Sequence, residues 1–221
     1  MLTGCCNSIL EAVGRTPLVR LGRLSPAGGG EIYAKVEALN PGGSIKTRAA
    51  LGMIEAAERA GQLRPGSIIV EASSGNQGIA MAMIGAVKGY RVRVVMPENM
   101  TVERRKLIEA YGAEVVLTPA GGSIGEAIQA ALAAAREMAA KDERVFLPRQ
   151  FENENNPETH RRTTAREIMA QLAGPAAAFV AAFGTGGTLT GIGEILKANW
   201  TGVRIVAVEP ENAAVLSGGK I

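Results

Sequence analysis

The stretch "SIIVEASSGNQGIAMAMIGAVKGYRVRVVMP", residues 67–97, predicts a strand, a helix and a second strand in succession. Residues 67–72 and 91–97 are short runs of β-branched and apolar side chains bounded by Gly, Pro or charged residues. Such runs are typical of buried strands, whereas residues 77–88 between them have a helical pattern. A helix between two buried strands predicts a βαβ unit with parallel strands.

The same alternation continues on both sides of this unit. Further strands are predicted at residues 31–37, 113–118, 144–147, 177–183 and 203–210. Further helices are predicted at residues 47–60, 101–111, 123–140, 158–172 and 187–198. This order predicts an α/β protein with mostly parallel, twisted sheets and helices on both faces. Because 221 residues are many for one domain and few for two, we expect two lobes.

The composition excludes several classes of protein. Hydrophobic residues make up 47% of the chain and charged residues 20%, which supports a packed core rather than disorder. The net charge is only +3 and the basic residues are scattered, so we expect no nucleic-acid partner. The two cysteines are the neighbours Cys5 and Cys6, which fits a reducing cytoplasm. Without an apolar run of about 18 residues or a signal-peptide pattern, we expect a cytoplasmic protein with no membrane contact.

Lys46 ends the loop "NPGGSIK", residues 40–46, at the expected start of a helix. In open α/β sheets, ligands bind where strands end and helices begin. A helix N-terminus disfavours a cation by roughly 0.3–1 kcal/mol, so Lys46 is either solvated or neutral. If Lys46 is buried, its pKa falls, and a neutral lysine amine is a nucleophile for aldehydes.

Two further loops follow predicted strands and precede helices. The loop "ASSGNQG" presents donors that suit a carboxylate, with an amide free for a phenolic oxygen; the alternative is a well-capped helix. Its candidate residues are Ser73, Ser74, Gly75, Asn76 and Gln77. The loop "GTGGTLTG", residues 184–191, has glycines that let a phosphate approach main-chain N–H groups; the alternative is a turn shaped by packing. Its candidate residues are Gly184, Thr185, Gly186, Gly187 and Thr188.

Together, one amine, one phosphate site and one carboxylate site suggest pyridoxal 5'-phosphate and an amino-acid substrate. Five stretches then carry a family resemblance: "NPGGSIK", "SSGNQGIA", "MPENMTVERRKLIEAYGAEVVLT", "QFENENNPETHRRTTAREI" and "GTGGTLTG". In their order and spacing they resemble the signatures of the cysteine synthase (O-acetylserine sulfhydrylase) and cystathionine β-synthase family, which are fold-type II pyridoxal-phosphate enzymes. The resemblance extends from about Ile9 to Ile221.

The resemblance implies a role for each candidate residue. Lys46 matches the lysine that forms the internal aldimine, and Asn76 matches the asparagine that bonds the cofactor's 3′-oxygen. Residues 184–188 match the phosphate loop. Ser73, Ser74, Gly75 and Gln77 match the loop that grips the substrate carboxylate, although the family often has threonine where Gln77 stands. Gln150 matches a glutamine that faces the same site.

The resemblance also implies an activity and an organisation. The activity is β-replacement, in which O-acetyl-L-serine and sulfide give L-cysteine and Lys46 acts as general base. Residues 39–143 would form a smaller mobile lobe, and residues 1–38 with 144–221 a larger phosphate-binding lobe. Relatives are generally homodimers, so we expect a homodimer. Relatives also continue past the position of Ile221, so we expect a truncated chain with an incomplete second lobe.

Two other interpretations stay open. A serine or threonine dehydratase would share Lys46 but release its intermediate to water, and a truncated remnant would bind the cofactor without activity. The only histidine, His160, is expected at the surface or as a helix cap. A chain with one histidine and two adjacent cysteines offers no zinc site of a familiar type, so no metal is expected.

Overall fold

The computed structural model describes residues 4–73, 75–211, 214 and 216–218. One half of the protein contains a four-stranded sheet in the order β5-β4-β3-β6. All of its neighbouring strands are parallel, and Ile69 of β3 lies beside both Val92 of β4 and Phe146 of β6. The strands are β3 (Ile68–Ala72), β4 (Arg91–Pro97), β5 (Glu114–Thr118) and β6 (Val145–Phe146).

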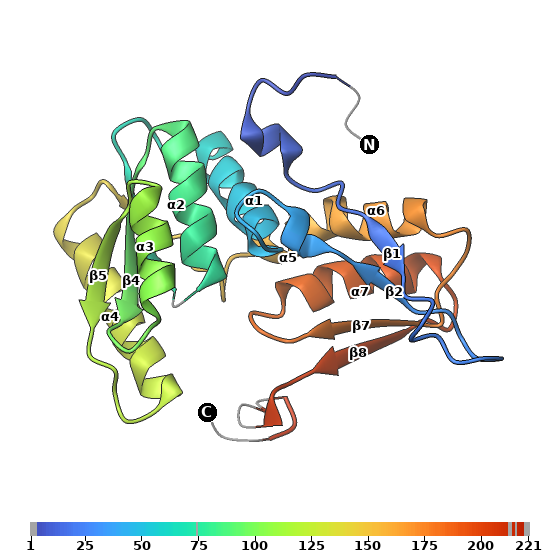
Figure 1. Cartoon of the computed structure of the whole chain (residues 1–221). Coiled ribbons are helices and arrows are strands. Elements are labelled where there is room, and N and C mark those ends of the chain that lie inside the picture. The colour runs from blue at the N-terminus through green and yellow to red at the C-terminus, as the bar shows by residue number, and fades with distance from the viewer. Residues whose placement is uncertain (1–3, 74, 212–213, 215, 219–221) are drawn as a thin grey trace.

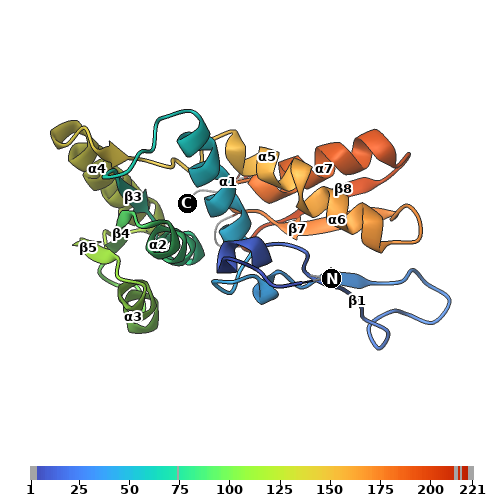
Figure 2. The same ribbon diagram turned by 90° about the horizontal axis from the view of Figure 1, so that it is seen from above.

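Helices cover both faces of this sheet. Helices α2 (Asn76–Lys88) and α3 (Val102–Ala110) lie on one face, and α4 (Ile124–Lys141) lies on the other (Figure 2). Apolar side chains of α2 pack with β3 and β4, while small alanines of α4 pack on Val70 and Val95. The βαβ unit predicted at residues 67–97 is therefore confirmed.

The other half of the protein has a two-stranded parallel sheet of β7 (Ala178–Ala182) and β8 (Arg204–Val208). Helices α6 (Thr164–Gln171) and α7 (Gly187–Asn199) pack on the face that carries Phe179 and Ile205. The opposite face leaves Val180, Val206 and Val208 exposed. Near this sheet, β1 (Leu18–Arg20) and β2 (Tyr33–Lys35) form an antiparallel pair. The N-terminal part of the chain also contains two short 3₁₀ helices, η1 (Ile9–Ala12) and η2 (Glu37–Leu39).

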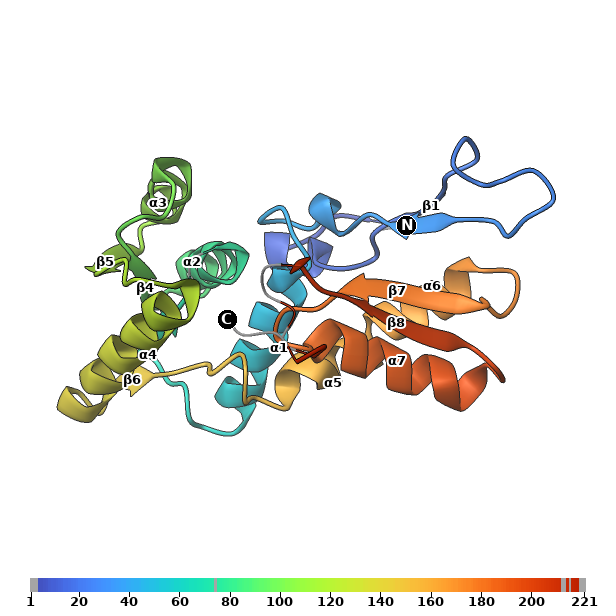
Figure 3. The ribbon, with the colours of Figure 1, turned by 90° about the horizontal axis from the view of Figure 1, so that it is seen from below.

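Two helices connect these halves. Helix α1 (Lys46–Arg59) packs against α2 on one side and against α5 (Asn155–Arg162) on the other, and α5 packs against α7 (Figures 1 and 3). The contact between α1 and α5 is close. A Cβ built on Gly52 of α1 would lie 1.8 Å from Oγ1 of Thr159, so only glycine fits there.

A buried ion-pair network fixes α1 to both neighbouring segments. Arg48, with a side chain only 2% exposed, pairs with Glu37 and with Glu167 of α6 at N···O distances of 2.7 Å. Lys35 also pairs with Glu167 at 2.7 Å. Burial acts to raise the pKa of Glu167, but hydrogen bonds from Arg48 and Lys35 outweigh it and hold the pKa at about 2. Every charge in the network therefore has a partner.

The predicted elements are confirmed with small differences in their bounds. The helix expected at 158–172 is two helices, α5 and α6, which meet at Thr163. The strand expected at 31–37 is the shorter β2, and it pairs antiparallel with β1, which the sequence pattern did not indicate. Strand β6 pairs with β3, so it joins the sheet of the segment that we expected to end at 143. The division into lobes at 39 and 143 stays a prediction.

Candidate active site

Lys46 is the first residue of α1, and its main-chain N–H donates to Oγ of Ser44 at 3.3 Å. The Lys46 Nζ lies 3.4 Å from Oε1 of Gln150 and 3.4 Å from Oγ1 of Thr185. Burial lowers the pKa of Lys46, and the charge of Glu71 partly opposes this effect. The amine is thus shifted toward the neutral, nucleophilic form.

Gln150 connects Lys46 to a buried carboxylate. Its Nε2 donates to Oε1 of Glu71 at 3.2 Å. Glu71 is 3% exposed, and its Oε2 has no hydrogen-bond partner among the described residues. Burial raises the pKa of Glu71 to about 8, against the opposing influence of the Lys46 charge and of the hydrogen bond from Gln150. The side chains of Lys46 from α1, Glu71 from β3 and Gln150 from the segment before α5 therefore lie next to one another.

The loop before α7 is shaped by glycine. Gly186 has a φ of 83°, which disfavours other residues. A Cβ on Gly187 would lie 2.2 Å from Oδ1 of Asn156, so the loop packs directly on α5. Asn156 donates through Nδ2 to Oγ1 of Thr185 and to the main-chain oxygen of Gln150, at 2.9 Å each. Asn156 thus orders both groups that contact the Lys46 amine.

His160 is 1% exposed, which contradicts the expected surface or capping role. Its Nε2 lies 3.2 Å from Oγ1 of Thr188, and its Nδ1 lies 2.9 Å from Oγ1 of Thr164. Burial lowers the pKa of His160 to about 4, with the charge of Arg48 adding to the effect, so the ring is neutral at pH 7. His160 therefore supports the loop of residues 184–188 as a neutral hydrogen-bonding group.

The loop before α2 is partly as predicted. Ser73 accepts the main-chain N–H groups of Gly75 and Gly78 at the start of α2 through Oγ, at 3.3 and 3.2 Å. Asn76 is exposed at the start of α2, and Ser74 lies outside the described residues. Gln77 is 2% exposed, and neither polar atom of its side chain has a hydrogen-bond partner within the described chain.

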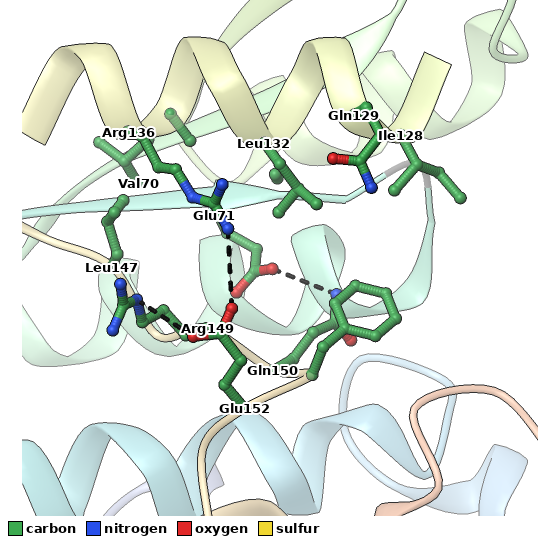
Figure 4. A pocket seen from close by; sticks show the side chains of 13 residues that line it. Val70, Glu71, Ile128, Gln129, Leu132, Arg136, Leu147, Arg149, Gln150 and Glu152 are labelled. Atoms are coloured by element: carbon green, nitrogen blue, oxygen red, sulfur yellow. Dashed lines mark hydrogen bonds and ion pairs between the residues drawn. The ribbon is translucent and has the colours of Figure 1, made fainter. Parts of the chain in front are cut away.

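A pocket of about 340 Å³ adjoins this cluster. Its wall is formed by α4, by the end of β3 and by the segment before α5, and the side chains of Glu71 and Gln150 meet at its edge (Figure 4). At the rim, Arg136 and Arg149 both lie 3.7 Å from Glu152. The pocket combines an apolar interior with a charged rim and has room for a small molecule.

The structure joins three of the predicted residues directly: Lys46, Gln150 and Thr185. Thr188 belongs to the same loop as Thr185, and Gly75, Asn76 and Gln77 lie at the start of α2. Three residues were missed: Glu71, Asn156 and His160. Two signals were present in the sequence. Glu71 is the one charge in an apolar strand, and Asn156 and His160 are spaced i and i+4, which places them on one helix face.

Residues 9–220 match the family model described as pyridoxal-phosphate dependent enzyme. The chain therefore belongs to this family, and its cofactor is pyridoxal phosphate. It is 49% identical over 216 residues to cysteine synthase of Staphylococcus aureus (strain Mu50 / ATCC 700699). The aligned residues make up 97% of this chain and 68% of that protein. It is 48% identical over 213 residues to a probable cysteine synthase of Bacillus subtilis (strain 168), covering 95% of this chain and 67% of that protein.

Solved structures show the same fold. The crystal structure of O-ureido-L-serine synthase has a TM-score of 0.90 and 50% identity, covering 99% of this chain and 67% of that chain. Cysteine synthase from Entamoeba histolytica has a TM-score of 0.89 and 39% identity, covering 97% and 64%. The fold is accordingly that of the fold-type II enzymes, and this chain is an enzyme of the cysteine synthase type.

The residues present fit pyridoxal phosphate. The main-chain N–H groups in the first turn of α7 have no partners within the helix, which suits a phosphate. Replacing Gly187 would fill the space that Asn156 occupies beside that turn. Lys46 supplies a buried amine of lowered pKa for the aldehyde.

In the described part of the chain, no helix is long and apolar enough to cross a membrane, and no cluster of three metal-ligating side chains occurs.

Proposed function

We propose that this protein makes L-cysteine from O-acetyl-L-serine and sulfide by pyridoxal-phosphate-dependent β-replacement. One observation carries the proposal: the Lys46 amine lies between Gln150 and Thr185, and burial lowers its pKa. The similarity to cysteine synthases supports the choice of substrates. When bound, the cofactor supplies an aldehyde for the amine and a ring that stabilises negative charge on the substrate's α-carbon.

In this proposal, the loop of residues 184–188 holds the cofactor's phosphate. Main-chain N–H groups and the hydroxyls of Thr185 and Thr188 would donate to the phosphate oxygens. Asn156 and His160 keep these two hydroxyls in place from α5. The exposed amide of Asn76 at the start of α2 would donate to the cofactor's phenolic oxygen.

Lys46 has a second task as general base. With a substrate bound at the cofactor, Nζ of Lys46 would take the proton from the substrate's α-carbon. A lowered pKa suits this task, because an amine that is protonated at pH 7 cannot accept a proton. Gln150 and Thr185 hold Nζ in place during the transfer.

The loop of residues 73–78 would bind the substrate carboxylate and close over it. We propose that the N–H groups at the start of α2 and the polar side chains of Ser73, Ser74 and Gln77 form this site, with Gly75 letting the backbone approach. Closure would exclude water and so favour replacement over release of the substrate as pyruvate. We also propose that the lobes 39–143 and 1–38 with 144–221 move relative to each other, and that the protein is a cytoplasmic homodimer.

The first experiment locates the cofactor. Protein incubated with pyridoxal phosphate is reduced with borohydride, digested and analysed by mass spectrometry. We expect a pyridoxyl tag on the peptide that contains Lys46, and none there in Lys46→Ala. A tag on a different lysine, or no tag on the wild-type protein, would contradict the proposal.

The second experiment separates the reactions. With O-acetyl-L-serine, sulfide-dependent formation of cysteine supports the synthase, whereas pyruvate release without sulfide supports a dehydratase. Because one structural relative is an O-ureido-L-serine synthase, hydroxyurea should be tested in place of sulfide. Binding of the cofactor with no turnover of any of these substrates would indicate the inactive remnant.

A further inference from the structure

Glu71 has no task in the chemistry proposed above, yet its position is costly. It is the one charged residue of strand β3, and it is 3% exposed. An ionisable group in such a place destabilises a protein unless its partners compensate. Oε1 of Glu71 accepts a hydrogen bond from Nε2 of Gln150 at 3.2 Å (Figure 4).

This hydrogen bond determines which way the Gln150 amide points. An amide has a donor end and an acceptor end, and Oε1 of Glu71 accepts the hydrogen bond from the donor end of Gln150. Nε2 of Gln150 therefore faces Glu71, and Oε1 faces the Lys46 Nζ at 3.4 Å. The reversed amide would place its carbonyl oxygen against Oε1 of Glu71 and its donor end against the lysine. The main chain of Gln150 is held separately, because its carbonyl accepts from Asn156.

We propose that Glu71 is a positioning residue that acts through Gln150: it fixes the amide so that the carbonyl oxygen faces the Lys46 amine. The inference rests on the role given to Lys46 under Proposed function. Glu71 sets both the direction of the amine and the ease with which it loses its proton. A purely structural Glu71 would support the folding of β3 and leave Lys46 unaffected.

The test measures the lysine without the cofactor. Cofactor-free protein is methylated with formaldehyde and cyanoborohydride over a range of pH, and peptide mass spectrometry gives the rate at Lys46. Lys141, whose side chain is 71% exposed, serves as an internal reference. The variants are Glu71→Gln, Gln150→Met and the double variant. Thr118→Val is the matched control, because Thr118 is also a buried polar residue of this sheet with no partner for its hydroxyl in the described chain.

We expect Glu71→Gln and Gln150→Met each to move the midpoint of the Lys46 profile to lower pH by about one unit, the value of one hydrogen bond to a charged group. The charge of Glu71 also acts directly on Lys46, so the double variant should shift further than Gln150→Met, but by less than the sum of the two single shifts. Among the described residues, Glu71 and His160 are the titratable groups that interact with Lys46; His160 stays neutral across this range, whereas Glu71 has a pKa of about 8. Thr118→Val should leave the midpoint unchanged.

Two results would overturn the inference: an unchanged midpoint in Glu71→Gln, or shifts that add up in the double variant. If Glu71→Gln does not fold, the wild-type protein still gives an answer. The Nε2 protons of Gln150, assigned by their loss in Gln150→Met, should exchange with solvent much more slowly than those of an exposed glutamine, and rapid exchange would refute the hydrogen bond. Because no cofactor is present, failure of the proposed function would appear only in the borohydride experiment.

Discussion

Replacing Arg48 with methionine is expected to destabilise the protein strongly while keeping side-chain bulk. Arg48 donates four hydrogen bonds of 2.7–2.8 Å to the carboxylates of Glu37 and Glu167. In Arg48→Met, Lys35 still contacts Glu167, but the partner common to both carboxylates is lost. Two buried negative charges would then face each other with only partial compensation.

The magnitude follows from two independent arguments. Removing one partner from a buried ion pair costs about 3–5 kcal/mol. Separately, the pKa of Glu167 falls from 4.5 to about 2 in the folded protein, which corresponds to roughly 3 kcal/mol of stability at pH 7. Arg48 is the first of the groups that cause this lowering, and Lys35 contributes as well. We therefore expect Arg48→Met to lower the free energy of unfolding by about 3–5 kcal/mol.

Urea unfolding followed by circular dichroism measures this loss at pH 7. Arg93→Met is the control, because Arg93 forms an exposed pair with Glu114 and its loss should cost at most about 1 kcal/mol. Since the pKa of Glu167 is depressed, its stabilisation is present above pH 4.5 and is lost as the pH falls toward 2. The difference between wild type and Arg48→Met should therefore narrow at pH 3. A loss below 1 kcal/mol at pH 7, or a difference independent of pH, would refute the reasoning.

Three further predictions concern close packing and protonation. Gly187→Ala should weaken cofactor binding at least tenfold in a spectroscopic titration, because its Cβ would meet Asn156; binding as tight as that of the wild type would contradict the close packing. Gly52→Ala should lower the free energy of unfolding by about 1–3 kcal/mol through the clash with Thr159, and Thr159→Ala should restore part of it; an unchanged urea midpoint would contradict the close contact. The NMR signals of His160, the only histidine, should not titrate between pH 8 and pH 5, because burial holds its pKa at about 4; a midpoint above pH 6 would show a solvated ring.

The sequence predicted the elements well because their signals are local. Strand β4 has the predicted bounds of 91–97, since a β-branched run between charge and proline is visible within seven residues. The break at Thr163 was missed because residues 158–172 contain no glycine or proline that would indicate the end of a helix. At the break, Oγ1 of Thr163 donates to the main-chain carbonyl of Thr159. Such a side-chain bond competes with the regular helix hydrogen bonds and favours a bend.

The site could be predicted only where a motif carries it. Lys46 and the loop of residues 184–188 were predicted from local patterns of glycine, threonine and lysine, and they stay predictions. Gln150 was placed by resemblance alone, since it is 104 residues from Lys46 in the sequence and no local pattern connects them. His160 was misjudged because its polar neighbours suggested a solvated segment, whereas the face that it shares with Asn156 is turned inward.

Because the helix is interrupted at Thr163, the segment of α5 and α6 contacts two different parts of the site. In α5, Asn156 bonds to Thr185 before α7, and His160 bonds to Thr188 within α7. In α6, Glu167 pairs with Arg48, which lies half a helical turn after Lys46 in α1. The turn proposed to bind the phosphate and the helix that begins with Lys46 are thus both held in place by the segment of α5 and α6. Amide hydrogen exchange should accordingly report α1, α5 and α6 opening as one cooperative unit, so that loosening this segment would disturb both ends of the cofactor together.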